Sequence, residues 1–172
     1  MSPRDEYRSG TVDSPIGDIT VVMADDAVVA VRVGDPAIAH EQLAREHAVV
    51  AADDDAVSAL VGPQLDDYFA GALQEFDLPL DWRFVTGFAR EALQTVCEIP
   101  YGETAGYGEI AARAGRPRAA RAVGSACRRT PFSVIVPVHR VVRSDGSIGD
   151  YGGSEHIKAF LLDLERGPSF GA

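Results

Sequence analysis

The sequence predicts two domains of different class: an α/β domain over residues 1–82 and a mainly α-helical domain over residues 83–172. Two observations support this division. Short β-branched runs open the first half, whereas helical spacing of apolar residues dominates the second. The chain has 172 residues and 46% hydrophobic content, which is enough to bury one ample core or two small ones.

The N-terminal half begins with three runs that have the composition of consecutive antiparallel strands. They cover residues 7–12, 18–23 and 27–33, and they alternate in part between apolar and polar residues. Residues 14–17, with Pro15 and Gly17, and the pair Asp25-Asp26 separate the runs, as turns do. We therefore expect a small antiparallel sheet.

Two helices are expected next, over residues 37–47 and 56–69. Leu60, Leu65, Tyr68 and Phe69 are spaced to form the inward stripe of the second helix. The triplet Asp53-Asp54-Asp55 precedes this helix and has two interpretations, a metal-binding carboxylate cluster or a helix N-cap. The N-cap is favoured, because carboxylates are stabilised at helix N-termini. Residues 77–83 then link the two domains.

The C-terminal half predicts a helix-turn-helix. A first helix over residues 84–98 ends before Pro100, and a short one over residues 107–114 is closed by Gly115. Pro117 suits the first turn of a third helix over residues 118–128. Two short helices joined by a glycine-containing turn are typical of DNA-binding motifs, in which the second helix enters a groove.

That last helix is small and basic, and composition alone leaves two interpretations open. It can be a tightly packed core helix with solvated arginines, or a helix that approaches a DNA duplex closely. Its arginines are Arg118, Arg121 and Arg128, with Arg129 directly after them.

Net charge is −10, but its distribution is uneven. Residues 1–82 hold 17 acidic and 4 basic side chains, whereas residues 83–143 hold 4 acidic side chains and 10 arginines. The chain has a single lysine against 15 arginines. A basic segment following an acidic one is consistent with DNA binding by the second domain alone.

The remaining composition predicts a soluble, cytoplasmic protein. No apolar run reaches the roughly 18 to 20 residues needed to span a bilayer, and residues 1–6 lack the pattern of a secretion signal. Cys97 and Cys127 are the only cysteines and form no CxxC motif, which argues against a disulfide framework or a zinc site. We expect both thiols to be reduced and no metal or cofactor to be bound.

Four segments of the C-terminal half carry a resemblance to a known family. They are Ile99-Pro100-Tyr101-Gly102-Glu103-Thr104, Tyr107-Gly108-Glu109-Ile110-Ala111-Ala112, Arg118-Ala119-Ala120-Arg121-Ala122-Val123-Gly124, and Pro137-Val138-His139-Arg140-Val141 after Pro131. In this order and spacing they resemble the O6-alkylguanine-DNA alkyltransferases, also called methylated-DNA-protein-cysteine methyltransferases. The resemblance covers nearly the whole chain, more weakly before residue 84. It implies a ribonuclease H-like first domain and a winged helix-turn-helix second domain.

The resemblance also implies a set of site residues. The arginine matching Arg121 fills the hole left by an extruded nucleotide, and the tyrosine matching Tyr107 helps rotate its phosphate outward. The DNA-binding residues are then Tyr107, Arg118, Arg121, Ala122 and Arg128. The pocket for the flipped base is formed by Cys127, Pro137, Val138, Val141, Tyr151 and Gly152. Such extrusion is required because the exocyclic oxygen of a stacked guanine is out of reach.

The family reads Pro-Cys-His-Arg-Val where this chain has Val138. Valine has no lone pair with which to attack carbon, so the relay residues His139 and Glu165 have no nucleophile to activate. The implied function is therefore that of an alkyltransferase-like protein that binds and flips O6-alkylguanine in duplex DNA without removing the alkyl group. It would act as a monomer, with no catalytic residue, and mark lesions for nucleotide-excision repair proteins.

Three alternatives remain open at the level of sequence. The chain could be an active transferase that uses Cys127, or an engineered Cys-to-Val form of an ordinary repair enzyme. Thr130 and the Ala105-Gly106 pair depart from the family's usual residues and favour a natural origin over the second alternative. The third alternative is a winged-helix regulator that binds a defined DNA sequence with no lesion preference.

Overall fold

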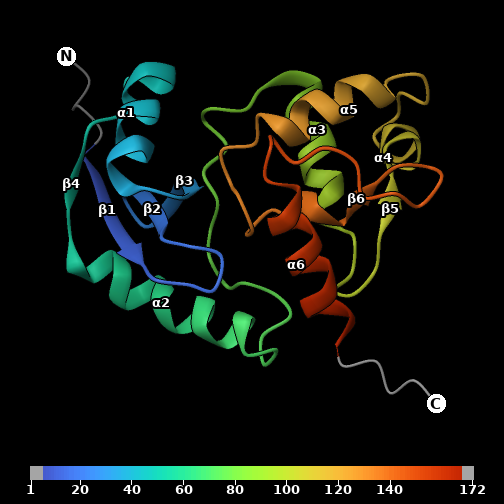
Figure 1. Ribbon diagram of the computed structural model, residues 1–172. Coiled ribbons are helices and arrows are strands. Elements are labelled where there is room, and N and C mark those ends of the chain that lie inside the picture. The colour runs from blue at the N-terminus through green and yellow to red at the C-terminus, as the bar shows by residue number, and fades with distance from the viewer. Residues whose placement is uncertain (1–5, 168–172) are drawn as a thin grey trace. The chain divides into compact units, whose positions relative to one another are not determined.

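The computed structural model describes residues 6–167, which fold as two compact units (Figure 1). The first takes in the chain up to Phe84 together with Pro131–Ser133, and the second takes in Val85–Thr130 and the chain from Val134 onward. The segment Pro131–Ser133 belongs to the first unit because the Val31 amide donates to the Pro131 carbonyl at 2.7 Å. Residues 1–5, on which most of the secretion-signal argument rests, lie outside the described residues.

The first unit is built on a four-stranded sheet of order β3-β2-β1-β4. Strands β1 (Tyr7–Val12), β2 (Ile19–Ala24) and β3 (Ala27–Val33) pair antiparallel in sequence order, as predicted. A fourth strand, β4 (Ala51–Asp53), pairs parallel to β1 and makes the sheet mixed, so the expectation of a purely antiparallel sheet was wrong. Three residues without a β-branched side chain give no strand signal in the sequence.

Helices α1 (Pro36–His47) and α2 (Asp55–Phe69) complete the first unit (Figure 1). Asp54 caps α2 by accepting a hydrogen bond from the Ala56 amide at 2.9 Å, which confirms the N-cap interpretation of the aspartate triplet. Leu65 and Tyr68 of the expected stripe are buried, but the placement of Leu60 in it was wrong, because that side chain is 49% exposed. The buried face of α2 is formed by Val57, Val61, Leu65 and Tyr68.

The second unit contains α3 (Gly87–Val96), β5 (Ala105–Gly106), α4 (Tyr107–Arg113), α5 (Ala120–Arg128), a 3₁₀ turn at Val138–Arg140, β6 (Val141–Val142) and α6 (Glu155–Arg166). Helix α3 is shorter than the predicted 84–98. Gly87 has a φ of +59°, which breaks the helix before it. Phe84 instead stacks on His47 of the first unit, with ring centroids 4.4 Å apart.

Helices α4 and α5 pack against each other and against α3, which confirms the helix pair predicted from the glycine-containing turn. Pro117 and Arg118 lie in the turn before α5, so the placement of Pro117 in its first helical turn was wrong. Strands β5 and β6 pair in parallel through Ala105 with Val141 and Gly106 with Val142. This pairing brings the start of α4 next to the segment that follows the 3₁₀ turn. No helix within residues 6–167 is long and apolar enough to cross a bilayer.

Candidate functional site

The most deeply buried polar group of the second unit joins the 3₁₀ turn to α6. His139 Nε2 lies 2.7 Å from Glu165 Oε1, and the two side chains are 0% and 1% exposed. Arg140 donates to both Glu165 oxygens, from Nε at 2.8 Å and from Nη2 at 2.9 Å. A third donor of Arg140, Nη1, reaches the Ile99 carbonyl at 2.7 Å. His139 and Arg140 thus hold the Glu165 carboxylate in a buried environment.

This geometry decides the state of the His139 ring. A carboxylate can only accept hydrogen bonds, so Nε2 carries the hydrogen and donates it to Glu165. Burial lowers the pKa of His139, an effect larger than the opposing attraction of Glu165, so the ring is neutral at neutral pH. Its Nδ1 is then a lone-pair acceptor, and it has no hydrogen-bond partner among the described residues. The ring therefore has the correct tautomer to accept a proton at Nδ1.

Val138 is the residue directly before His139, whose Nδ1 is this acceptor. Its side chain is 4% exposed, and it belongs to the same 3₁₀ turn as His139 and Arg140. Pro137, before it, is buried, and Val141, after the turn, is fully buried. An isopropyl group offers neither a proton to Nδ1 nor an electron pair to a substrate. Residue 138 therefore has no group that could exchange a proton with His139.

Tyr107, at the start of α4, is packed into a space left by glycines. A Cβ added to Gly124 would lie 3.8 Å from the Tyr107 ring, and one added to Gly149 would lie 3.1 Å from its hydroxyl oxygen. The Lys158 amine lies 5.9 Å from the ring centroid. Residues from α4, α5, α6 and the loop before α6 therefore meet at Tyr107. Desolvation raises the pKa of its hydroxyl, which keeps it a neutral hydrogen-bond donor.

Cys127 lies close enough to Tyr151 to contribute to the raised pKa of the tyrosine hydroxyl. Burial raises the pKa of the Cys127 thiol to about 12 and that of Tyr151 to about 12. Lys158 attracts the Cys127 thiolate, but this effect is smaller than the desolvation that opposes it. Both side chains are neutral in this environment. Gly152, also expected in the pocket, is exposed and has a φ of +58°.

The outer face of α5 carries the residues expected to contact DNA. Arg121, Ala122 and Arg128 are exposed on the helix, whereas Val123 and Ala126 are buried beneath them. Arg118, in the preceding turn, is also exposed. Both interpretations left open by composition, a packed helix with solvated arginines and a helix that approaches DNA, place the arginines on this exposed face. The helix presents a basic outer surface on a buried apolar stripe.

Sequence reasoning missed Lys158. It is 1% exposed and donates from Nζ to the Val141 carbonyl at 2.7 Å, which ties α6 to β6. Burial lowers the pKa of its amine. The signal was available, because Lys158 is the only lysine in a chain with 15 arginines. The role of Arg140 as the second partner of Glu165 was also missed.

The comparisons with known proteins agree with this architecture. A family model described as "6-O-methylguanine DNA methyltransferase, ribonuclease-like domain" matches residues 7–82, and one described as the DNA binding domain of the same methyltransferase matches residues 87–167. A methylated-DNA--protein-cysteine methyltransferase of Mycobacterium bovis is 42% identical over 156 residues, covering 91% of this chain and 90% of the relative. One of Methanosarcina barkeri is 50% identical over 103 residues, covering 60% of this chain and 65% of the relative.

Solved structures show the same fold. The crystal structure of Mycobacterium tuberculosis OGT in complex with DNA matches with a TM-score of 0.80 at 41% identity, covering 94% of this chain and 92% of that one. A small mixed sheet with helices, followed by a helical DNA-binding unit, is the two-domain fold of the O6-methylguanine DNA methyltransferases. The chain belongs to the O6-methylguanine DNA methyltransferase family.

Proposed function

We propose that this protein binds O6-alkylguanine in duplex DNA, flips the base out of the stack and holds it without transferring the alkyl group. The observation that carries the proposal is Val138. It stands directly before His139 in the buried turn, where the resemblance places the reactive cysteine. Transfer of the alkyl group to this residue would require a nucleophilic side-chain atom, and the isopropyl group of valine provides none.

The remaining machinery for recognition is present, which supports binding over a loss of all function. Tyr107 is fixed at the start of α4, and Arg121 is exposed on the outer face of α5. By resemblance these are the residues that rotate the phosphate and fill the vacated space in the duplex. A small helix of this kind binds in the minor groove, where sequence discrimination is weak. Affinity should then depend on how easily the base unstacks, which favours a damaged pair.

Cys127 is a poor substitute for the missing nucleophile. Thiolate is the reactive form, and burial raises the pKa of this thiol to about 12, which leaves a negligible thiolate fraction at neutral pH. In the pair that could act as a proton relay, His139 belongs to the turn that carries residue 138, and Glu165 reaches it from α6. These features argue against a transferase that has moved its nucleophile to α5.

A protein that holds a lesion without repairing it needs a later step. A flipped, bound base is a persistent distortion of the duplex, and its removal requires excision of the damaged strand. We therefore include in the proposal that the complex marks the lesion for nucleotide-excision repair proteins.

The test uses one duplex with a single O6-methylguanine and the same duplex with guanine. Equilibrium affinity is measured for both, and the intact mass of the protein is measured after prolonged incubation. Tighter binding to the methylated duplex with unchanged protein mass is the expected result. The Mycobacterium bovis relative, run in parallel, serves as a positive control for a gain of one methyl group.

Two results would contradict the proposal in different ways. A gain of one methyl group by the wild-type chain, absent in Cys127→Ser, would identify an active transferase that uses Cys127. Equal affinity for the two duplexes would instead favour a DNA-binding regulator with no lesion preference.

A further inference from the structure

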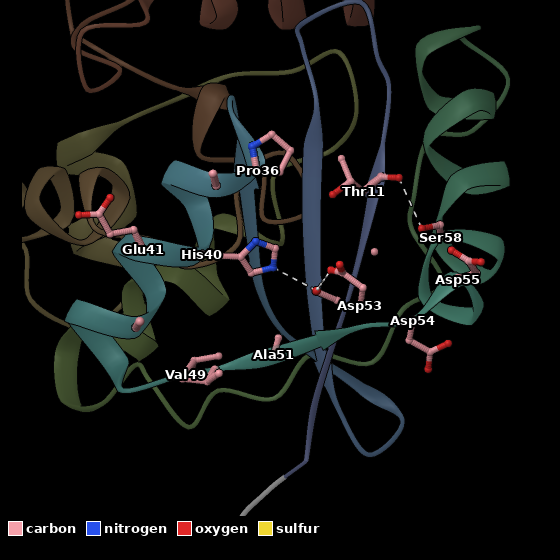
Figure 2. Close-up of a pocket in the computed structure, with 15 residues that line it drawn as sticks. Thr11, Pro36, His40, Glu41, Val49, Ala51, Asp53, Asp54, Asp55 and Ser58 are labelled. Atoms are coloured by element: carbon pink, nitrogen blue, oxygen red, sulfur yellow. Dashed lines mark hydrogen bonds between the residues drawn. The ribbon is translucent and has the colours of Figure 1, made fainter.

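The groove of the first unit, between α1 and α2, is unsuited to a DNA phosphate (Figure 2). Its lining includes Asp53 and Asp54 but no lysine or arginine, and all the lining residues lie within residues 6–167. The Ser9 hydroxyl donates to Asp53 Oδ1 at 3.3 Å, and Arg8 pairs with Asp54 at 3.2 Å. An acidic lining repels phosphate. Contacts to the DNA backbone beyond those of α5 are therefore expected in the second unit.

In the second unit, the segment after β6 forms a tight turn that fixes the backbone of Arg143. The Gly146 amide donates to the Arg143 carbonyl at 2.9 Å, and the Arg143 amide donates to the Ser147 carbonyl at 3.0 Å. Asp145 Oδ1 accepts hydrogen bonds from the amide and the hydroxyl of Ser147, at 2.9 Å and 2.7 Å. These hydrogen bonds hold the turn without using the Arg143 side chain.

The Arg143 side chain and the Tyr107 hydroxyl border the same position, above Gly149. A Cβ added to Gly149 would lie 3.1 Å from the Tyr107 hydroxyl oxygen and 3.6 Å from Arg143 Nε. Gly149 is buried and has a φ of +74°, which glycine adopts without steric cost. A guanidinium and a hydroxyl, both hydrogen-bond donors, are thus brought together from the turn after β6 and from the start of α4.

The Arg143 guanidinium has an exposed and weakly held partner. Its Nη2 lies 3.3 Å from Asp150 Oδ1, and the two side chains are 55% and 74% exposed. An exposed ion pair of this kind contributes little to stability, because water and salt screen it. Another anion can therefore replace Asp150 at little cost.

A second arginine acts on the same tyrosine. Desolvation is the largest effect on the pKa of the Tyr107 hydroxyl and raises it, whereas the positive charges of Arg143 and Arg128 oppose this rise. Arg128 comes from the end of α5, on the face expected to contact DNA. Two cations from separate elements thus lie near one hydroxyl, an arrangement that favours an anion with several acceptor oxygens.

We propose that Arg143, together with the Tyr107 hydroxyl, binds the phosphate of the extruded nucleotide, and that Asp150 holds the guanidinium when DNA is absent. This inference rests on the proposed function, from which it takes the position of Tyr107 at the rotated phosphate. A guanidinium can form two parallel hydrogen bonds to a phosphate, whereas it makes one to Asp150. Because the contact is to the backbone, it serves any alkyl adduct equally.

The test measures the affinity of the full chain for the methylated duplex at several salt concentrations. Each neutralised phosphate contributes about 0.9 to the slope of log affinity against log salt. Arg143→Gln should lower the slope by about one contact and weaken binding about tenfold at physiological salt. Arg143→Lys keeps the charge and should retain the slope. The matched control, Arg166→Gln, removes an arginine from an exposed pair with Asp163 on α6 and should keep the affinity within about twofold.

Asp150→Asn distinguishes a displaceable partner from a general charge effect. If Asp150 competes with the phosphate for Arg143, its removal should tighten binding about threefold in the wild type and have no effect in Arg143→Gln. Asp163→Asn, taken from the control pair, should leave the affinity unchanged in both proteins.

Three outcomes would overturn the inference. They are an unchanged salt slope in Arg143→Gln, an equal loss of slope in Arg166→Gln, and a tightening by Asp150→Asn that persists without Arg143. Thermal unfolding of each variant checks that the fold is retained, as expected for exposed side chains. The same slopes are measured on the unmodified duplex. Equal wild-type affinity for the two duplexes contradicts the proposed function, whereas an unchanged slope with the preference retained contradicts only the Arg143 contact.

Discussion

Glu165 accepts the Nε2 hydrogen of His139 at 2.7 Å, and this contact leaves Nδ1 of a neutral, buried imidazole as a free acceptor. This is the geometry that the proposed relay requires. The pair also has a structural role beside Val138. The Glu165 carboxylate accepts a hydrogen bond from Arg140, and the Arg140 guanidinium also donates to the Ile99 carbonyl. Glu165 therefore connects α6, the 3₁₀ turn and the residue before Pro100.

Glu165→Gln should destabilise the protein by about 3–5 kcal/mol, because it leaves the Arg140 charge buried without a countercharge. Urea unfolding measures the effect. Glu109→Gln is the control, because it removes the same group from an exposed pair with Arg113 and should change stability by less than about 0.5 kcal/mol. A small effect at Glu165 would mean that water reaches Arg140.

His139 should make stability depend on pH below neutrality. Burial lowers its pKa in the folded protein, so the unfolded chain binds a proton first as pH falls. Its stabilising contribution is therefore present above the unfolded pKa of about 6.5 and is lost as pH falls below it towards the folded pKa. The urea midpoint should fall more between pH 7.5 and 5.5 in the wild type than in His139→Gln. An equal fall in both proteins would assign the dependence to other groups.

Val138→Cys should restore transfer if the relay is intact. Cysteine is close to valine in volume. Its S–H group would belong to the residue directly before His139, whose Nδ1 is a free acceptor. The sulfur would form a bond to the methyl carbon as the bond from that carbon to the guanine oxygen breaks, and the base would leave with a proton. Incubation with the methylated duplex should add one methyl group to this variant. Val138→Ala should add none, and a silent Val138→Cys would show that the pocket holds the base in an unreactive position.

Arg121→Ala should weaken binding to the methylated duplex by roughly 1–3 kcal/mol, as loss of a groove-inserted arginine does. Because the side chain is exposed, the fold should be unaffected. Arg113→Ala is the matched control, since this arginine is also exposed but pairs with Glu109 on α4. The measurement is equilibrium affinity at fixed salt. Equal losses for the two variants would indicate a general charge effect.

Ala48→Gly should stabilise the protein by about 1 kcal/mol. Ala48 ends α1 in the left-handed conformation, with a φ of +55°, which glycine adopts without steric cost. Ala44→Gly, within the same helix, should have the opposite effect of about 1 kcal/mol. Thermal unfolding of the two variants gives the comparison. Destabilisation by both changes would show that the left-handed conformation of Ala48 carries no strain that glycine can relieve.

The sequence by itself determined the elements whose signals are local. Strands β1 and β3, helix α4 and the cap at Asp54 follow from β-branched runs, helical periodicity and capping residues. The family was also readable from the sequence, because a motif is a property of consecutive residues. Leu60 shows the limit of this reasoning, because periodicity predicts a stripe but not which neighbour covers it.

Only the tertiary structure decided the features that depend on distant segments. Strand β4 exists because β1 offers it a partner, and Pro131–Ser133 returns to β3 across a hundred residues of chain. The buried Lys158 and the double pairing of Glu165 arise where separate elements meet. Their energies come from desolvation and hydrogen bonds between residues far apart in sequence, and no local pattern encodes these.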